Sequence, residues 1–81
     1  MNHTEFMELH AAFVRLMRSY FVEVEKSSTL LSECTEKPLP LKKRLALTSQ
    51  GIIEHEAHLM YLSAKSLLLE AARLGYSFSD N

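Results

Sequence analysis

The first half of the chain repeats its apolar residues with the period of an α-helix. Two rows recur at every seventh position, namely Phe6, Phe13 and Tyr20 and, beside them, His10, Met17, Val24 and Leu31. Alternation of apolar and polar residues with a period of two is missing, so a strand is disfavoured. The pattern predicts a helix over about residues 3–34, with an apolar sector that covers roughly half of its circumference, well beyond the usual ~100° stripe.

Two short motifs bear on where this first helix begins and whether it stays whole. Asn2 with Glu5 three residues later reads as a capping box, with Thr4 as a competing N-cap. The run Lys26-Ser27-Ser28-Thr29 is the weak point, because serine and threonine side chains compete for backbone hydrogen bonds. We expect the helix to continue through it, since Leu31 and Cys34 stay in phase with the earlier rows.

The segment 35–40 is the one clear break in the pattern. Pro38 and Pro40 each bias the preceding residue away from the α region. Pro40 also suits the first position of a following helix, where its missing N–H is no loss. A short proline loop is therefore predicted here.

The second half predicts a helix over about residues 41–74. Large residues recur at every seventh position (Ile53, Met60, Leu67 and Leu74), and alanines recur between them (Ala57, Ala64 and Ala71). We expect these two rows to form the seam against the first helix. Gly51 costs about 1 kcal/mol inside a helix, so it marks either a kink or a close approach by another helix. Gly75 is placed to end the helix as its C′ residue, with Tyr76 able to fold back.

Together these elements predict an all-α, single-domain fold of 81 residues with a short tail over 75–81. Two helices of more than 30 residues, each about 50 Å long at 1.5 Å per residue, are expected to form a long antiparallel hairpin. Charge supports the pairing, because residues 1–36 hold six acids and three bases whereas residues 37–81 hold four acids and six bases. Glu33 and Glu36 would lie near the basic cluster of residues 42–44.

The hairpin leaves apolar surface unused. Met7, Val14 and Phe21 lie beside the first seam row, and Leu62 and Leu69 lie away from the second. Patches of this kind normally mark interfaces. A homodimer of hairpins that forms a four-helix bundle is the expected solution. The alternatives are a helix or groove on another protein, or a compact monomer that kinks at Ser27–Ser28 or Gly51.

This architecture favours a non-enzymatic protein–protein interaction module, such as a small chaperone, adaptor, inhibitor or regulator, acting through apolar helix faces. No catalytic residue, cofactor, metal or small-molecule substrate is predicted. Eight residues are expected to contact the partner: Phe13, Tyr20, Phe21, Ile53, Met60, Leu62, Leu67 and Leu69.

Composition narrows the setting in which the protein works. The net charge of −1 provides no strong field for nucleic acid or membrane. No apolar run approaches the roughly 18 residues of a membrane span. A single cysteine, Cys34, and a first segment unlike a signal peptide favour a reducing, cytoplasmic setting.

Two local clusters carry alternative functions. His55 and His58 share one helical face, with Glu54 in reach of His58, which permits a metal-binding helical bundle. The spacing differs from that of the His-Glu-x-x-His zinc motif, and a solvated polar face explains it more simply. The basic cluster Lys42–Arg44 permits weak, salt-sensitive nucleic-acid binding, although no recognition motif accompanies it. Cys34 has acidic neighbours, which do not favour a reactive thiolate.

Overall fold

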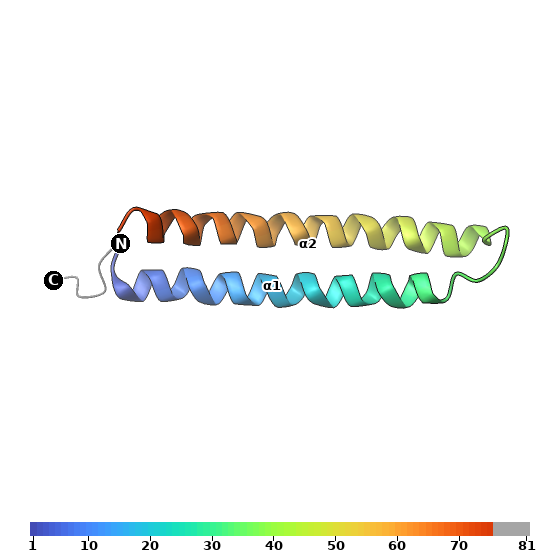
Figure 1. Ribbon diagram of the computed structural model, residues 1–81, viewed down its shortest axis with the longest axis horizontal. Helices are drawn as coiled ribbons and strands as arrows, with labels where there is room; N and C mark the ends of the chain where they lie inside the picture. The colour runs from blue at the N-terminus through green and yellow to red at the C-terminus, as the bar shows by residue number, and fades with distance from the viewer. Residues whose placement is uncertain (76–81) are drawn as a thin grey trace.

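A computed structural model, which describes residues 1–75, contains two helices in an antiparallel hairpin (Figure 1). Helix α1 spans His3–Ser32 and helix α2 spans Leu41–Arg73. The all-helical hairpin is confirmed, and the helix ends lie within two residues of the predicted ones. The residues between the helices form the turn, in which the Lys37–Pro38 peptide bond is cis.

The beginning of α1 follows from its first residues. The Asn2 side-chain oxygen accepts a hydrogen bond from the Glu5 amide at 2.8 Å, and the Glu5 carboxylate accepts one from the Asn2 amide at 3.1 Å. This reciprocal pair is the predicted capping box, with Asn2 and not Thr4 as the N-cap. The helix then runs through Ser27 and Ser28 without a break, as expected.

The turn is held by one lysine. Lys43 Nζ donates hydrogen bonds to the Glu33 carbonyl oxygen at 3.1 Å and to the Glu36 carboxylate. The hydrogen bond to Glu36 raises the pKa of Lys43 above its ordinary value, and the negative charge of Glu36 raises it further. Pro40 is the residue before α2, one position earlier than predicted, and its carbonyl oxygen accepts from the Arg44 amide at 3.0 Å.

Helix α2 runs through Gly51 without interruption. A Cβ atom built at Gly51 meets no other atom within 4 Å, so no neighbouring helix of this chain approaches the glycine closely. At the other end, Gly75 has a φ of 72° and directly follows Leu74, the C-cap residue. It is therefore the predicted C′ glycine in the left-handed region. The predicted fold-back of Tyr76 lies outside the described residues.

The two helices meet along a line of contact that we call the inner seam. Its residues are half-buried or buried and follow each other at alternating steps of three and four, the spacing of antiparallel coiled coils. On α1 they are Phe6, Leu9, Phe13, Leu16, Tyr20, Glu23, Ser27 and Leu30, and Cys34 continues the spacing just beyond the end of the helix. On α2 they are Lys43, Leu47, Gln50, Glu54, Ala57, Tyr61, Ala64, Leu68 and Ala71.

The prediction that the row of large residues on α2 lines this seam is wrong. Ile53, Met60, Leu67 and Leu74 are all exposed, and Leu67 retains 59% of its accessible surface. The alanine row lies in the seam as predicted. The physical reason is the packing of rings: Phe13 and Tyr20 stack on Tyr61 of α2, and the alanines before and after Tyr61 in the seam leave room for these rings.

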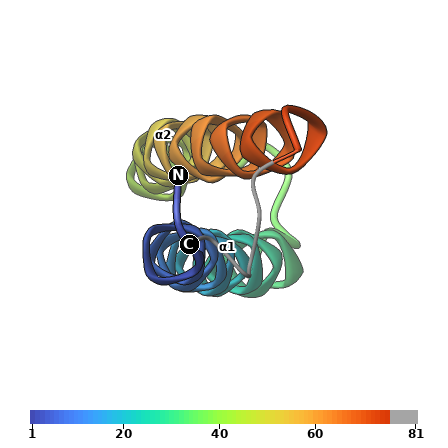
Figure 2. The ribbon, with the colours of Figure 1, turned by 90° about the vertical axis from the view of Figure 1, so that its left-hand side faces the viewer.

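The hairpin therefore has a contact line but almost no core. Among the described residues only Gln50, at 8%, and Ala71, at 9%, retain less than a tenth of their accessible surface. The principal extents of 64 × 14 × 14 Å are those of a rod. Viewed end on, α1 and α2 form a single layer with open faces on both sides (Figure 2).

Candidate interaction surface

The half of the inner seam nearer the chain termini is built from stacked rings. Tyr61 stacks on Phe13 and on Tyr20, with ring centroids 5.6 and 5.7 Å apart. Tyr20 also stacks on His58 at 4.7 Å. Such ring pairs add about 0.5–1.5 kcal/mol each beyond their buried area. Phe13 and Tyr20, which the sequence assigned to a partner interface, are thus already engaged inside the hairpin.

The half of the seam nearer the turn is polar. The Gln50 amide nitrogen donates hydrogen bonds to the Glu23 backbone carbonyl and to its carboxylate, both at 3.0 Å. The Ser27 hydroxyl is buried and has no hydrogen-bond partner among the described residues. Hydrogen-bonded polar groups in a seam fix its register but add little stability. The hairpin is accordingly weaker toward its turn.

Helix α1 carries a second apolar line, which we call the α1 outer row. Each of its members follows an inner-seam residue by one position, so the row is turned about 100° around the helix from the seam. The row consists of Met7, His10, Val14, Met17, Phe21, Val24, Ser28 and Leu31. It also steps by three and four, and it holds no Asp, Glu, Lys or Arg. Phe21, with 53% of its surface accessible, is its largest residue.

Two residues of α2 extend the face on which the α1 outer row lies. Leu62 and Leu69 each follow an inner-seam residue by one position, and in antiparallel helices this places them on the same side of the hairpin as the row. Both are exposed. They therefore lie outside the line of contact between the two helices, and their role in partner contacts stays a prediction.

The opposite side of the hairpin presents what we call the α2 outer row: Ile53, Met60 and Leu67. These residues precede inner-seam residues by one position and are therefore turned the other way. Beside them lies an open depression of about 370 Å³, lined by Leu16, Leu59, Met60, Ser63, Ala64 and Leu67. Six of the eight predicted contact residues thus lie on exposed surface, although on two different sides of the molecule.

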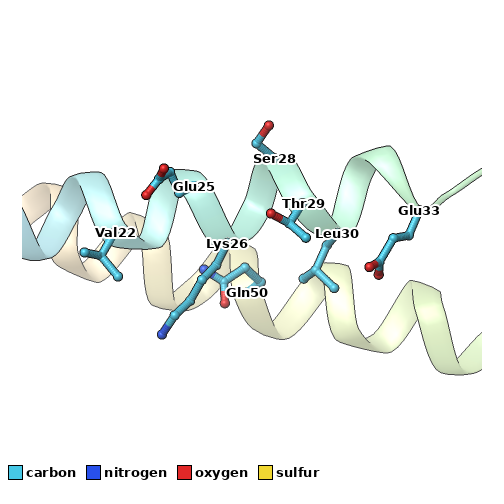
Figure 3. A pocket seen from close by; sticks show the side chains of 8 residues that line it. All are labelled: Val22, Glu25, Lys26, Ser28, Thr29, Leu30, Glu33 and Gln50. Carbon is cyan, nitrogen blue, oxygen red and sulfur yellow. The ribbon is translucent and has the colours of Figure 1, made fainter.

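A larger depression of about 710 Å³ lies near the polar half of the seam (Figure 3). Gln50 reaches it from α2, and its other lining residues all belong to α1 or follow its end. Figure 3 shows Glu25 and Ser28 pointing away from α2 while Leu30 points toward it. Ligand sites bring several polar groups together on one point, and these side chains diverge, so the geometry does not support a small-molecule site.

The two alternative clusters gain little from the structure. His58 stacks on Tyr20, and no group of three or more potential ligands among residues 1–75 is placed to hold a metal ion. Lys43, the middle residue of the basic cluster, is engaged by Glu33 and Glu36. One chain therefore assembles neither a metal centre nor a continuous basic surface around these residues.

Comparison with protein-family models, with curated proteins and with solved structures finds no match for this chain. Neither helix within residues 1–75 combines the length and apolar character needed to cross a membrane.

Sequence reasoning missed the polar part of the seam and the role of Tyr61. The signal was available, because the steps of three and four that run through Gln50, Glu54, Ala57 and Tyr61 are as regular as those of the larger residues. Residue size drew attention to the wrong row. Spacing shared by both helices would have identified the correct one.

Proposed function

We propose that the protein is a non-enzymatic interaction module whose working unit contains more than one chain, in the form of a dimer of hairpins that builds a four-helix bundle. One observation carries this proposal: large apolar side chains on both helices are about half exposed, while the seam between the helices buries only Ala71 and Gln50 among the described residues. An exposed apolar surface of this extent normally marks a protein interface.

Energetics support association as well. Burying a large apolar side chain contributes about 1.5–3 kcal/mol, whereas small domains are stable by only about 5–15 kcal/mol in total. The free faces thus hold stabilisation comparable to that of a whole small fold. The single cysteine of the chain cannot form an internal disulfide, and residues 1–75 hold no group of side chains placed to bind a metal ion, so packing against another chain is the remaining source of added stability.

The experiment is thermal unfolding followed by circular dichroism over a hundredfold range of protein concentration. Association of folded chains makes the unfolding midpoint rise with concentration. We expect such a rise, together with weak binding of an apolar dye at the highest concentrations, where the faces are covered. A midpoint independent of concentration would contradict the proposal.

A further inference from the structure

The α1 outer row has an order of residues that reads the same from both ends. Large apolar residues occupy its two ends and its centre, and its two polar members, His10 and Ser28, lie at equal distances from Ser19. Antiparallel helices pair residues at equal distances from their symmetry point, because their chains run in opposite directions. The row is therefore complementary to a second copy of itself.

We infer that two copies of this chain associate through their α1 helices, packed antiparallel about a two-fold axis near Ser19. This inference rests on the proposed function and names the interface. The pairs between one copy and the second are Met7 with Leu31, His10 with Ser28, Val14 with Val24, and Met17 with Phe21. Every apolar residue meets an apolar one, and the two polar residues meet each other.

The charges agree with a second copy as the occupant. The row itself holds no charged residue, so no like charges are buried in the symmetric contact. Arg18 and Glu25 lie on its solvent-facing flank, and both are exposed. The two-fold axis brings these residues of both copies to the same flank, where two arginines and two glutamates sum to zero charge and water and salt screen the two Arg18 side chains next to the axis.

The area fits a dimer. The chain exposes 6093 Å², whereas a compact folded monomer of 9.3 kDa exposes about 5,000 Å². A stable interface of standard size covers roughly 800 Å² per partner, which is a small part of the surface that this extended hairpin exposes. Because the inner seam and the row are about 100° apart around α1, the second α1 and α2 lie in nearly perpendicular directions from the axis of α1, as the two neighbours of one helix do in a four-helix bundle.

The α2 outer row lacks this symmetry. Its large residues alternate with Glu56, Ser63 and Glu70 at the intermediate positions. Antiparallel pairing that gives every position from Ile53 to Glu70 a partner sets each large residue against a serine or glutamate, whereas the register centred on Met60 pairs Ile53 with Leu67 but leaves Glu56 and Ser63 of each copy without a partner in the row. Parallel pairing sets Glu56 against Glu56. The second copy therefore docks on the face of the α1 outer row and not on the α2 outer row.

The first test is spin labelling of the full chain with Cys34→Ser, carrying Arg18→Cys, Ala11→Cys or Ser32→Cys one at a time. All three labelled positions are exposed. The antiparallel axis near Ser19 predicts separations along the helix of about 3, 24 and 39 Å between the two labels. Separations that are the same at all three positions, or that are shortest at Ser32, would overturn the inference.

The second test compares Phe21→Glu with Ile53→Glu, a matched control of similar exposure on the other side of the hairpin. Because each dimer buries two Phe21 side chains, Phe21→Glu is expected to raise the dissociation constant of the dimer at least about 100-fold, and Ile53→Glu less than about threefold. A dimer that survives Phe21→Glu but dissociates with Ile53→Glu would overturn the inference and leave the proposed function standing. A chain that never associates would overturn both.

Discussion

The two outer rows both expose large apolar residues and differ in what lies between these residues. On α1 the intermediate positions are filled by further apolar residues such as Met17 and Val24, whereas on α2 they hold Glu56 and Ser63. The first row can close against an identical helix, and the second cannot. The comparison teaches that exposed apolar area alone does not identify a self-association face, because complementarity along the row decides it.

The largest expected effect comes from opposite charges placed in the α1 outer row. Val14→Glu and Val24→Lys, each as a single variant, should weaken the homodimer at least about 100-fold, because a charge is buried against an apolar residue twice per dimer. An equimolar mixture should regain association to within about tenfold of the unmodified protein, since the glutamate of one variant then faces the lysine of the other. Sedimentation equilibrium measures both.

The same exchange made in the α2 outer row is its control. Ile53→Glu and Leu67→Lys should leave the dissociation constant of the dimer unchanged, both as single variants and as an equimolar mixture. If each α2 variant instead weakened the dimer and their mixture restored it, the α2 outer row would be the homodimer interface.

The second prediction compares a residue of α2 in the inner seam with a residue in the α2 outer row. Tyr61→Ala removes the ring that stacks on Phe13 and Tyr20 and should lower the free energy of unfolding by about 2–4 kcal/mol. Leu67→Ala, at a residue 59% exposed, should lower it by less than about 0.5 kcal/mol. Urea unfolding at one fixed protein concentration gives both values, and equal losses would show that the α2 outer row is covered.

A smaller effect is expected in the polar half of the seam. Gln50→Ala removes both hydrogen bonds to Glu23 and should cost about 1–2 kcal/mol of unfolding free energy. Ser49→Ala, at the exposed neighbouring position, is the control and should change it by less than about 0.5 kcal/mol. Gln50 lies in the inner seam and not in the α1 outer row, so Gln50→Ala should leave the distances between the spin labels of the two copies unchanged.

The smallest effects are expected at the two glycines, where substitution by alanine should change the free energy of unfolding in opposite directions. Gly51→Ala meets open space inside a helix and should stabilise the fold by about 0.5–1 kcal/mol. Gly75→Ala must adopt a φ of 72° and should destabilise it by about 1 kcal/mol. Destabilisation by Gly51→Ala would indicate that another chain passes close to that glycine.

The sequence was sufficient for every feature that is encoded locally. The Asn2–Glu5 capping box, the proline turn and Gly75 each define a helix end through residues close in the chain, so the two helices and their ends could be predicted. The apolar residues of α2 lie almost all around the helix, so helical period alone did not determine which side faces α1. That choice depended on the rings of Phe13, Tyr20 and Tyr61, which contact each other across the two helices.

The candidate contact residues were also predicted only in part. Phe21, Leu62 and Leu69 lie on exposed surface as expected, because they fall outside any arrangement of the seam. Phe13 and Tyr20 belong to the hairpin itself. The residues Ile53, Met60 and Leu67, expected both in the seam and in partner contacts, are found only on the outside.

The central claim is that the free faces of this hairpin are covered by a second chain of the same kind. Sedimentation equilibrium of the unmodified protein from about 1 to 100 µM, concentrations that span common homodimer affinities, tests it most directly. We expect the mass to rise with protein concentration to twice the 9.3 kDa of one chain. A mass of 9.3 kDa throughout this range, with helix content retained, would contradict it.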